Sequence, residues 1–292
     1  MVAPTPVVTA DWFATRIAAL RKERGLTPRE LAGALGRNAS GIRHFESSTR
    51  LANKDYIEIV LAQLGHSQLI DPYWRVIERA KRKPLWWKGM LPRVKKSQRP
   101  SELHQLELLV NFESSAEHIH LYAPQTVPDL VQTSRYADAL DEVAEPLLGE
   151  LHRRLRPGRQ AVLHQDEPPT LHVLLDEPVL YRAVGGGDVL REQLVALLDL
   201  TELPHVTVQV VPAGAGFAAE GNFALLDLSP ELERDPGAVF VKTAADWIHF
   251  RTEQKVDRYR SRWAALLRHA VTPELTRTML ERTARELASV SQ

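Results

Sequence analysis

The feature that most constrains this chain is a helix start signal at Thr27. Thr27 is followed directly by Pro28 and then, three residues after the threonine, by Glu30. A threonine that caps a helix, a proline in the first turn and a glutamate that reaches back to the cap together open an α-helix. The segment PRELAGALG continues with leucines at helical spacing and ends at Gly36. The sequence therefore predicts a short, capped helix that stops at a tight glycine turn.

Further helices are predicted on both sides of this segment. Before it, residues 11–24 place apolar side chains at i, i+4 and i+7, and Gly25 ends the pattern. After it, Asn38 is a cap for a third helix, ASGIRHFE, and a fourth helix is predicted from about Lys54 to Leu64. A capped helix, a glycine turn and a helix with exposed polar residues are typical of a helix-turn-helix module that binds double-stranded DNA.

The third helix is the predicted reading element. Ile42 and Phe45 are spaced to face the core, which leaves polar side chains pointing outward. Arg43 is the leading candidate, because a guanidinium can pair in two places with a guanine edge, a contact of ~1–3 kcal/mol. The basic side chains outside this helix would hold phosphates, or would simply be solvated charges. The candidates for base reading are Ala39, Ser40, Arg43 and His44, and those for phosphate binding are Arg29, Arg37 and Arg50.

Charge is divided unevenly along the chain, although its formal net charge is zero. Residues 1–100 carry 19 Lys and Arg against 8 Asp and Glu, whereas residues 101–292 carry 18 against 29. A basic front part joined to an acidic remainder fits a head that binds a polyanion and a separate body that does not bind DNA.

The absence of cysteine excludes disulfides, thiolate nucleophiles and cysteine-ligated zinc. The first residues, MVAPTPVVTADWF, lack a basic stretch followed by an apolar run. No segment approaches the ~20 consecutive apolar residues that span a membrane. We therefore expect a cytoplasmic protein that has no membrane partner.

Three regions are predicted. A helix-turn-helix domain over residues 1–66 is followed by a basic helix and linker over residues 67–100, and by a larger domain over residues 101–292. Asp71 and Pro72 form a cap and first-turn pair that predicts the start of the basic helix. Between Arg75 and Arg99 the chain has ten basic residues and one acidic residue. This region either lies along DNA phosphates or only connects the two domains.

The third region alternates short apolar strands with helices. The segments TLHVLLD, HVTVQVVP, FALLDL, AVFVKT and DWIHF read as strands, and DVLREQLVALLDL reads as an amphipathic helix. A last helix is predicted to start at Thr272 and Pro273. The predicted fold class is α+β, with an all-α helix-turn-helix domain followed by an α/β domain that has a mixed sheet.

Two resemblances to known families cover most of the chain. LTPRELAGALG followed by IRHFE resembles the Cro/repressor-type (XRE) helix-turn-helix family. ESSAEHIHLYAPQTVPDLVQTSRYADAL, the double tryptophan before it, and VLLDEPVLYRAVGGGDVLREQLVALLDL with VTVQVVP resemble WhiJ-like, antitoxin-like regulators of actinobacteria. The chain departs from the usual XRE glutamine and glycine at Pro28 and Ser48, and from the usual WhiJ-like glycine and leucine at Asp129 and Val131. The second resemblance implies a small protein partner.

Motifs that would indicate an enzyme are weak. The glycine run 185–187 precedes a helix but has no following lysine with serine or threonine, and Asp188 would itself cap that helix. His118 and His120 share one face of a strand but have no third metal ligand nearby. The adjacent carboxylates at 176 and 177 read as a turn at the end of a strand. No GxSxG or HExxH arrangement occurs, so we expect no catalytic residue, metal or cofactor.

The sequence supports two kinds of regulator. The leading prediction is a homodimeric DNA-binding protein that reads paired half-sites ~34 Å apart and whose C-terminal domain binds a small protein partner. The alternative is a one-component regulator whose C-terminal domain binds a small-molecule effector. Aromatic residues in irregular or strand-end segments would line the effector or partner site. They are Trp86, Trp87, Tyr122, Tyr136 and Trp247.

Overall fold

The computed structural model divides the chain into two compact units. The helical unit comprises Met1–Leu85 together with Leu228–Asp235, and the sheet unit comprises Trp86–Asp227 together with Pro236–Gln292. The first boundary therefore lies inside the region predicted as a basic helix and linker. The structure describes residues 2–36, 50–92, 100–141, 146–215, 221–243 and 247–290.

Three helices of the helical unit begin at a residue whose side chain caps them, namely Thr5, Thr27 and Asn53. The predicted capping box is confirmed, because Thr27 Oγ1 accepts from the Glu30 backbone N–H at 3.2 Å and Glu30 Oε2 accepts from the Thr27 backbone N–H at 2.7 Å. The helices are α1 (Pro6–Glu23), α2 (Pro28–Ala34), α4 (Lys54–Gln63), the 3₁₀ turn η1 (Ser67–Leu69) and α5 (Ile70–Arg82).

Two helix starts in this unit differ from the prediction. Helix α1 begins at Pro6 rather than near Asp11, because Thr5 and Pro6 form an earlier cap and first-turn pair. Helix α5 begins at Ile70, and the prediction that Asp71 caps it is wrong. The 3₁₀ turn η1 runs directly into α5, so this helix has no separate side-chain cap.

The core of the helical unit forms where α1 and α5 pack together. Trp12, Phe13 and Ile17 of α1 are each at most 2% exposed, as is Tyr73 of α5. The rings of Trp12 and Tyr73 meet edge to face with their centroids 4.7 Å apart. Such aromatic pairs add to the apolar burial that holds the two helices together.

The sheet unit contains a six-stranded sheet in the order β3-β2-β1-β4-β5-β6. Strands β1, β2 and β3 pair in parallel, and β4, β5 and β6 pair antiparallel. The predicted α+β class with a mixed sheet is confirmed. The strands are β1 (Ala116–Ala123), β2 (Thr170–Asp176), β3 (Val206–Val211), β4 (Phe223–Leu228), β5 (Ala238–Lys242) and β6 (Trp247–Phe250).

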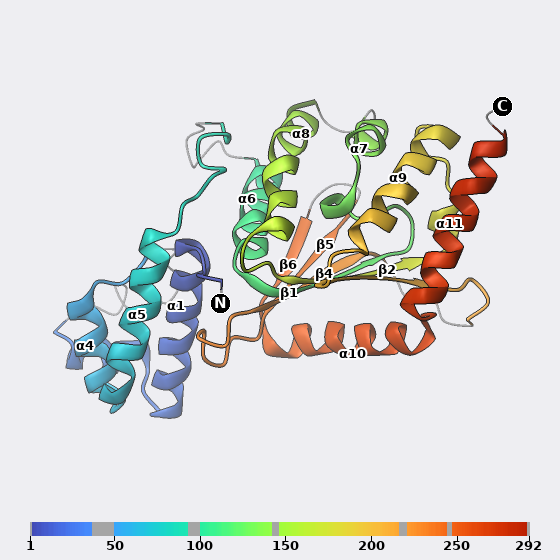
Figure 1. Ribbon diagram of the computed structural model, residues 1–292. Helices are drawn as coiled ribbons and strands as arrows, with labels where there is room; N and C mark the ends of the chain where they lie inside the picture. Colours follow the sequence, from blue (N-terminus) through green and yellow to red (C-terminus); the bar gives the residue numbers. More distant parts are fainter. Residues whose placement is uncertain are drawn as a thin grey trace. The chain divides into compact units, whose positions relative to one another are not determined.

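Helices cover both faces of this sheet. Helix α10 lies along one face, and α6, α8 and α9 lie over the other (Figure 1). Val256, Trp263 and Leu266 of α10 pack with Tyr122 and Phe223 in one buried cluster. The helical segments are α6 (Ser101–Glu113), η3 (Asp129–Val131), α7 (Ser134–Asp141), α8 (Pro146–Gln160), η4 (Ala161–His164), η5 (Glu177–Leu180), α9 (Gly187–Leu200), α10 (Glu253–His269) and α11 (Pro273–Val290).

The start of α11 is as predicted, whereas the start of α9 is not. Thr272 Oγ1 accepts from the backbone N–H of Leu275 at 3.3 Å, which caps α11. At α9 the residue that precedes the helix is Gly186 rather than Asp188, and its φ of 96° is accessible mainly to glycine. None of the helices in the described ranges is long and apolar enough to cross a bilayer.

Candidate functional site

The predicted DNA-contacting residues are only partly described. Ala39, Ser40, Arg43 and His44, and also Arg37, lie outside the described residues. Arg29 lies on α2 and is exposed, and Arg50 is exposed before α4. Both remaining phosphate-binding candidates are therefore on the surface of the helical unit, where a phosphate can reach them.

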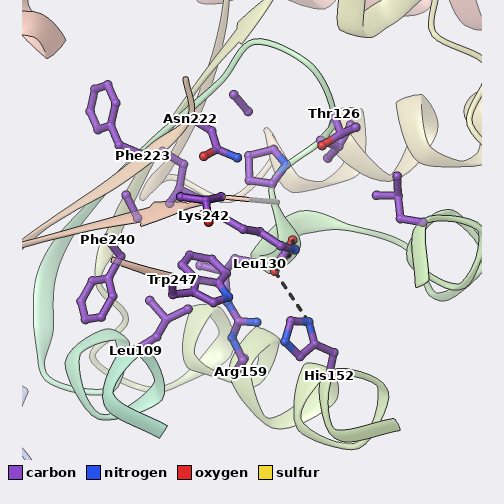
Figure 2. A pocket seen from close by; sticks show the side chains of 18 of the residues that line it. Leu109, Thr126, Leu130, His152, Arg159, Asn222, Phe223, Phe240, Lys242 and Trp247 are labelled. Atoms are coloured by element: carbon purple, nitrogen blue, oxygen red, sulfur yellow. Dashed lines mark hydrogen bonds and ion pairs between the residues drawn. The ribbon is translucent and has the colours of Figure 1, made fainter. Parts of the chain in front are cut away.

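The sheet unit contains a cavity of about 830 Å³. Its walls come from α6, β1 and the loop after it, η3, α7, α8, and strands β4, β5 and β6 (Figure 2). Leu109, Leu130, Ala224 and Phe240 supply apolar surface. Pockets for small organic molecules have volumes of ~300–1,000 Å³ and combine such apolar walls with a few polar groups.

A carboxylate on η3 organises the polar side of the cavity. Lys242 Nζ donates to both oxygens of Asp129 at 3.2 Å, and His152 Nδ1 lies 4.0 Å from Asp129 Oδ2. The Asp129 side chain is 19% exposed, that of His152 14% and that of Lys242 40%. Figure 2 shows His152, Arg159, Lys242 and Trp247 grouped on one side of the cavity. The more exposed lysine side chain therefore pairs with a less exposed carboxylate.

A second ion pair lies between α6 and α8. Arg159 donates through Nε and Nη2 to the two carboxylate oxygens of Glu113, both at 2.8 Å. Each side chain is 5% exposed. Burial alone would lower the pKa of Arg159, but the paired Glu113 carboxylate raises it above its ordinary value. The Arg159 guanidinium is thus held in its charged form by two charge-assisted hydrogen bonds.

The pKa values of the central groups are shifted in ways that fix their charges near neutral pH. Burial opposes the ionisation of Asp129, but the cations Lys242 and Arg159 outweigh it and lower the pKa of this carboxyl to about 2. Burial lowers the pKa of His152 to about 4, although the Asp129 carboxylate acts in the opposite direction. The cavity therefore holds a charged aspartate beside an uncharged imidazole.

Asn222 and Trp247 add to the polar lining. The Oδ1 atom of Asn222 is buried and has no hydrogen-bond partner among the described residues. Lys242 Nζ lies 5.5 Å from the centroid of the Trp247 ring, within the range of a cation–π contact. The Asn222 oxygen is an acceptor that a bound molecule can satisfy.

The aromatic residues predicted for an effector or partner site fall in several places. Tyr122 and Trp247 line the cavity, and the Tyr122 hydroxyl donates to Asp176. Trp87 and Tyr136 are buried elsewhere in the sheet unit, and the Tyr136 hydroxyl accepts from the backbone N–H of Val127. Trp86 packs so closely on Gly158 that a Cβ there would lie 2.3 Å from its ring. The structure thus brings two of the five together at the cavity.

The residues weighed for catalysis or metal binding are engaged in structural contacts. His118 and His120 stack with their ring centroids 6.4 Å apart, and His120 lies beside Asp227 on a strand. Glu177 accepts from the backbone N–H of Ala213 at 3.0 Å. Among the described residues no group of three or more His, Cys, Asp or Glu side chains is placed to hold a metal ion.

The charged residues of the cavity are those that the sequence reasoning missed. Asp129 was noted only as a departure from a family pattern, and His152, Arg159 and Lys242 were not selected. One signal was available for Lys242, because it ends the apolar strand AVFVK. No comparable signal marked the residues on α8.

A segment from the C-terminal half of the chain belongs to the helical unit. The chain leaves the sheet unit after Asp227, contributes Leu228–Asp235 to the helical unit, and returns at Pro236. We call Leu228–Asp235 the inserted segment. Its Leu232 is 2% exposed. The connection between β4 and β5 therefore contributes one buried leucine to the helical unit, whereas its Pro230 and Arg234 are exposed.

Glu233 anchors the inserted segment. Its carboxylate accepts from Arg16 Nη2 at 3.3 Å and from the Tyr73 hydroxyl at 3.0 Å, and its backbone carbonyl accepts from Trp12 Nε1 at 3.1 Å. Burial raises the pKa of Tyr73 to about 12, so the hydroxyl stays protonated and donates. A second carboxylate, Glu231, accepts from Arg79 Nη1 at 2.5 and 2.6 Å. These contacts tie the segment to both α1 and α5.

Comparison with known families fits both units. The family described as "Helix-turn-helix domain" matches residues 12–68, and this match supports a DNA-binding regulator. The family described as "Domain of unknown function (DUF5753)" matches residues 106–282, and the chain belongs to this family. No curated protein and no solved structure matches the chain.

Proposed function

We propose that this protein is a DNA-binding transcription regulator that responds to a small-molecule effector, which binds in the cavity of the sheet unit. The observation that carries the proposal is the path of the chain between β4 and β5. These two strands line the cavity, and the segment that joins them is part of the helical unit that contains the helix-turn-helix domain. A molecule bound against the strands can therefore act on the DNA-binding unit through the chain itself.

The hairpin geometry supports this route. Ala224 pairs with Phe240 at the cavity, and two residues further along the hairpin Leu226 pairs with Ala238. The inserted segment follows directly and is anchored through Glu233. A ligand has to favour one of two arrangements to change DNA affinity. The two arrangements would differ by a shift of β4 and β5 that moves Glu233 relative to α1 and α5.

The geometry favours the small-molecule alternative, because the cavity has the size and the polar groups of a ligand pocket. The small protein partner implied by the family resemblance remains a prediction, for which the cavity gives no specific support. We further propose an XRE-type head that acts as a homodimer in the cytoplasm and a C-terminal domain without catalytic activity. The support for these points is the sequence pattern and the usual pairing of half-sites.

The first experiment measures DNA binding by the full chain. Fluorescence anisotropy would follow its binding to a duplex from upstream of its own gene and to a pool of random duplexes, over a series of salt concentrations. We expect affinity to fall steeply as salt rises, because phosphate contacts release counterions. Arg43→Ala is expected to relax sequence preference by ~1–3 kcal/mol at one base pair. Absence of salt-sensitive binding to every duplex would refute the proposal.

The second experiment tests the route from cavity to DNA. Compounds that raise the melting temperature of the full chain would be selected, and DNA affinity would be measured with and without each compound. We expect at least one compound to change DNA affinity. In Glu233→Ala this change is expected to shrink while binding of the compound persists, because the anchor of the inserted segment is lost.

The matched control is Glu58→Ala, which removes a surface carboxylate of α4 that pairs with Lys54 at 3.7 Å. It should leave the response to the compound unchanged. An equal response in wild type, Glu58→Ala and Glu233→Ala would show that the inserted segment does not carry the signal. If every compound that stabilises the protein left DNA affinity unchanged, the effector function itself would be wrong.

A further inference from the structure

We propose that the cavity of the sheet unit takes an organic cation, a molecule with an apolar body and a protonated amine that binds at Asp129. This inference rests on the proposed function and names the chemical class of the effector. The argument uses the charges that line the cavity, the engagement of its two cations, and the position of the Lys242 ammonium group.

The lining has more carboxylates than cations. An uncharged His152 adds no positive charge near neutral pH. A cavity whose formal charge is negative attracts cations and repels anions. The lining carboxylates are Glu102, Glu113, Asp129 and Asp141, and the lining cations are Arg159 and Lys242. Asp141 is also paired with Arg156 at 3.4 Å, and with this cation included the carboxylates still outnumber the cations by four to three.

Both cations already have carboxylate partners. Arg159 is held at two points by Glu113, with side chains that are 5% exposed, so it has little freedom to turn toward a ligand. Lys242 is held by both oxygens of Asp129. An anionic ligand would have to compete with a protein carboxylate for either cation. The two ion pairs thus argue against an anion as the effector.

The Lys242 ammonium group marks a place where an amine fits. Its Nζ atom lies 3.2 Å from both oxygens of Asp129 and 5.5 Å from the centroid of the Trp247 ring. A carboxylate and an aromatic ring on the same cation are the two interactions that proteins use for ammonium ligands. The Lys242 side chain is 40% exposed, so it can leave Asp129 for solvent when a ligand amine replaces it.

The rest of the cavity fits the body of such a molecule. Leu109, Leu130, Ala224 and Phe240 supply the apolar walls. The Oδ1 atom of Asn222, which has no partner within the described ranges, is an acceptor and suits a second N–H or O–H donor on the ligand. The lining therefore combines a carboxylate for the ammonium group with an apolar chamber for the hydrocarbon part.

The test compares three probes that share one body and differ in charge. Isothermal titration calorimetry of the full chain at neutral pH would use 4-phenylbutylamine, 4-phenylbutyrate and 4-phenylbutan-1-ol. We expect the amine to bind at least about tenfold more tightly than the alcohol, and the acid to bind most weakly, because a charge-assisted hydrogen bond forms only with the amine. Tighter binding of the acid or the alcohol overturns the proposal, as does absence of binding by the amine.

Two variants make the result specific to Asp129 and Lys242. In Asp129→Asn we expect the affinity for the amine to fall about tenfold or more and the affinity for the alcohol to stay unchanged. In Lys242→Met we expect tighter binding of the amine, because the competing ammonium group is removed. If the effector class were anionic, Lys242→Met would instead abolish the binding of 4-phenylbutyrate. Weaker binding of the amine in Lys242→Met overturns the proposal, because the lysine would then not compete with the amine for Asp129.

The matched controls lie at exposed positions of α10, which packs on the other face of the sheet. Asp257→Asn removes a carboxylate that is 58% exposed and paired with Arg260. Lys255→Met removes an exposed lysine that lies over the Phe250 ring. Neither should change amine binding. If the acid or the alcohol binds and alters DNA affinity, the effector function stands and only the cationic class is wrong.

Discussion

Replacement of Arg159 by methionine should destabilise the sheet unit by about 3–5 kcal/mol. The guanidinium group makes two hydrogen bonds of 2.8 Å to Glu113, and both side chains are 5% exposed. Methionine keeps much of the side-chain volume but leaves the Glu113 carboxylate buried without its cation. The large cost arises from this unpaired charge rather than from the energy of the ion pair itself. The double variant Glu113→Leu/Arg159→Met should therefore be more stable than Arg159→Met alone.

Urea unfolding of the full chain, followed by circular dichroism, would measure these free energies. Since two units need not unfold together, hydrogen exchange of the β1 and β2 amides would identify the transition of the sheet unit. The control is Arg153→Met on the same helix. Arg153 is 50% exposed and pairs with Glu150 at 2.6 Å, so its loss should cost about 1 kcal/mol or less. The reasoning fails if Arg159→Met costs no more than Arg153→Met, or if the double variant is as unstable as the single one.

Two further predictions concern pH and backbone conformation. Because the pKa of His152 is lowered to about 4, the unfolded chain takes up this proton first as the pH falls, and stability should decline by roughly 3 kcal/mol between about pH 6.5 and 4. In chemical unfolding over this pH range, the free energy of unfolding should decline less for His152→Gln than for the wild type. Equal declines in the two proteins would contradict the prediction. Gly237 has a φ of 84°, and a Cβ there would lie 2.7 Å from the Leu226 carbonyl oxygen, so Gly237→Ala should cost more than about 1 kcal/mol. Gly214→Ala, with no described atom within 4 Å of its Cβ, is the control, and equal melting temperatures for the two variants would show that the clash is relieved.

Local features of the fold could be predicted from the sequence because they depend on neighbours in the chain. The capping box joins Thr27 and Glu30, which are three residues apart, and Thr272 caps α11 through Leu275. Strands β2 to β6 could be predicted from their apolar segments. The same local reasoning failed for Asp71 and Asp188, because η1 runs into α5 and a glycine with positive φ precedes α9. At both helix starts another local conformation, the 3₁₀ turn or the glycine with positive φ, takes the place of the predicted cap.

The sequence by itself determined the helix-turn-helix pattern, the α+β class and the division of charge, since each follows from composition or from spacing along the chain. Only the tertiary structure decided the cavity and the path of the inserted segment. Asp129 and Lys242 are 113 residues apart, and Arg16 and Glu233 are 217 apart. Contacts of this kind form when the sheet and its helices pack, and no periodic pattern in the sequence encodes which distant charges a folded chain brings together.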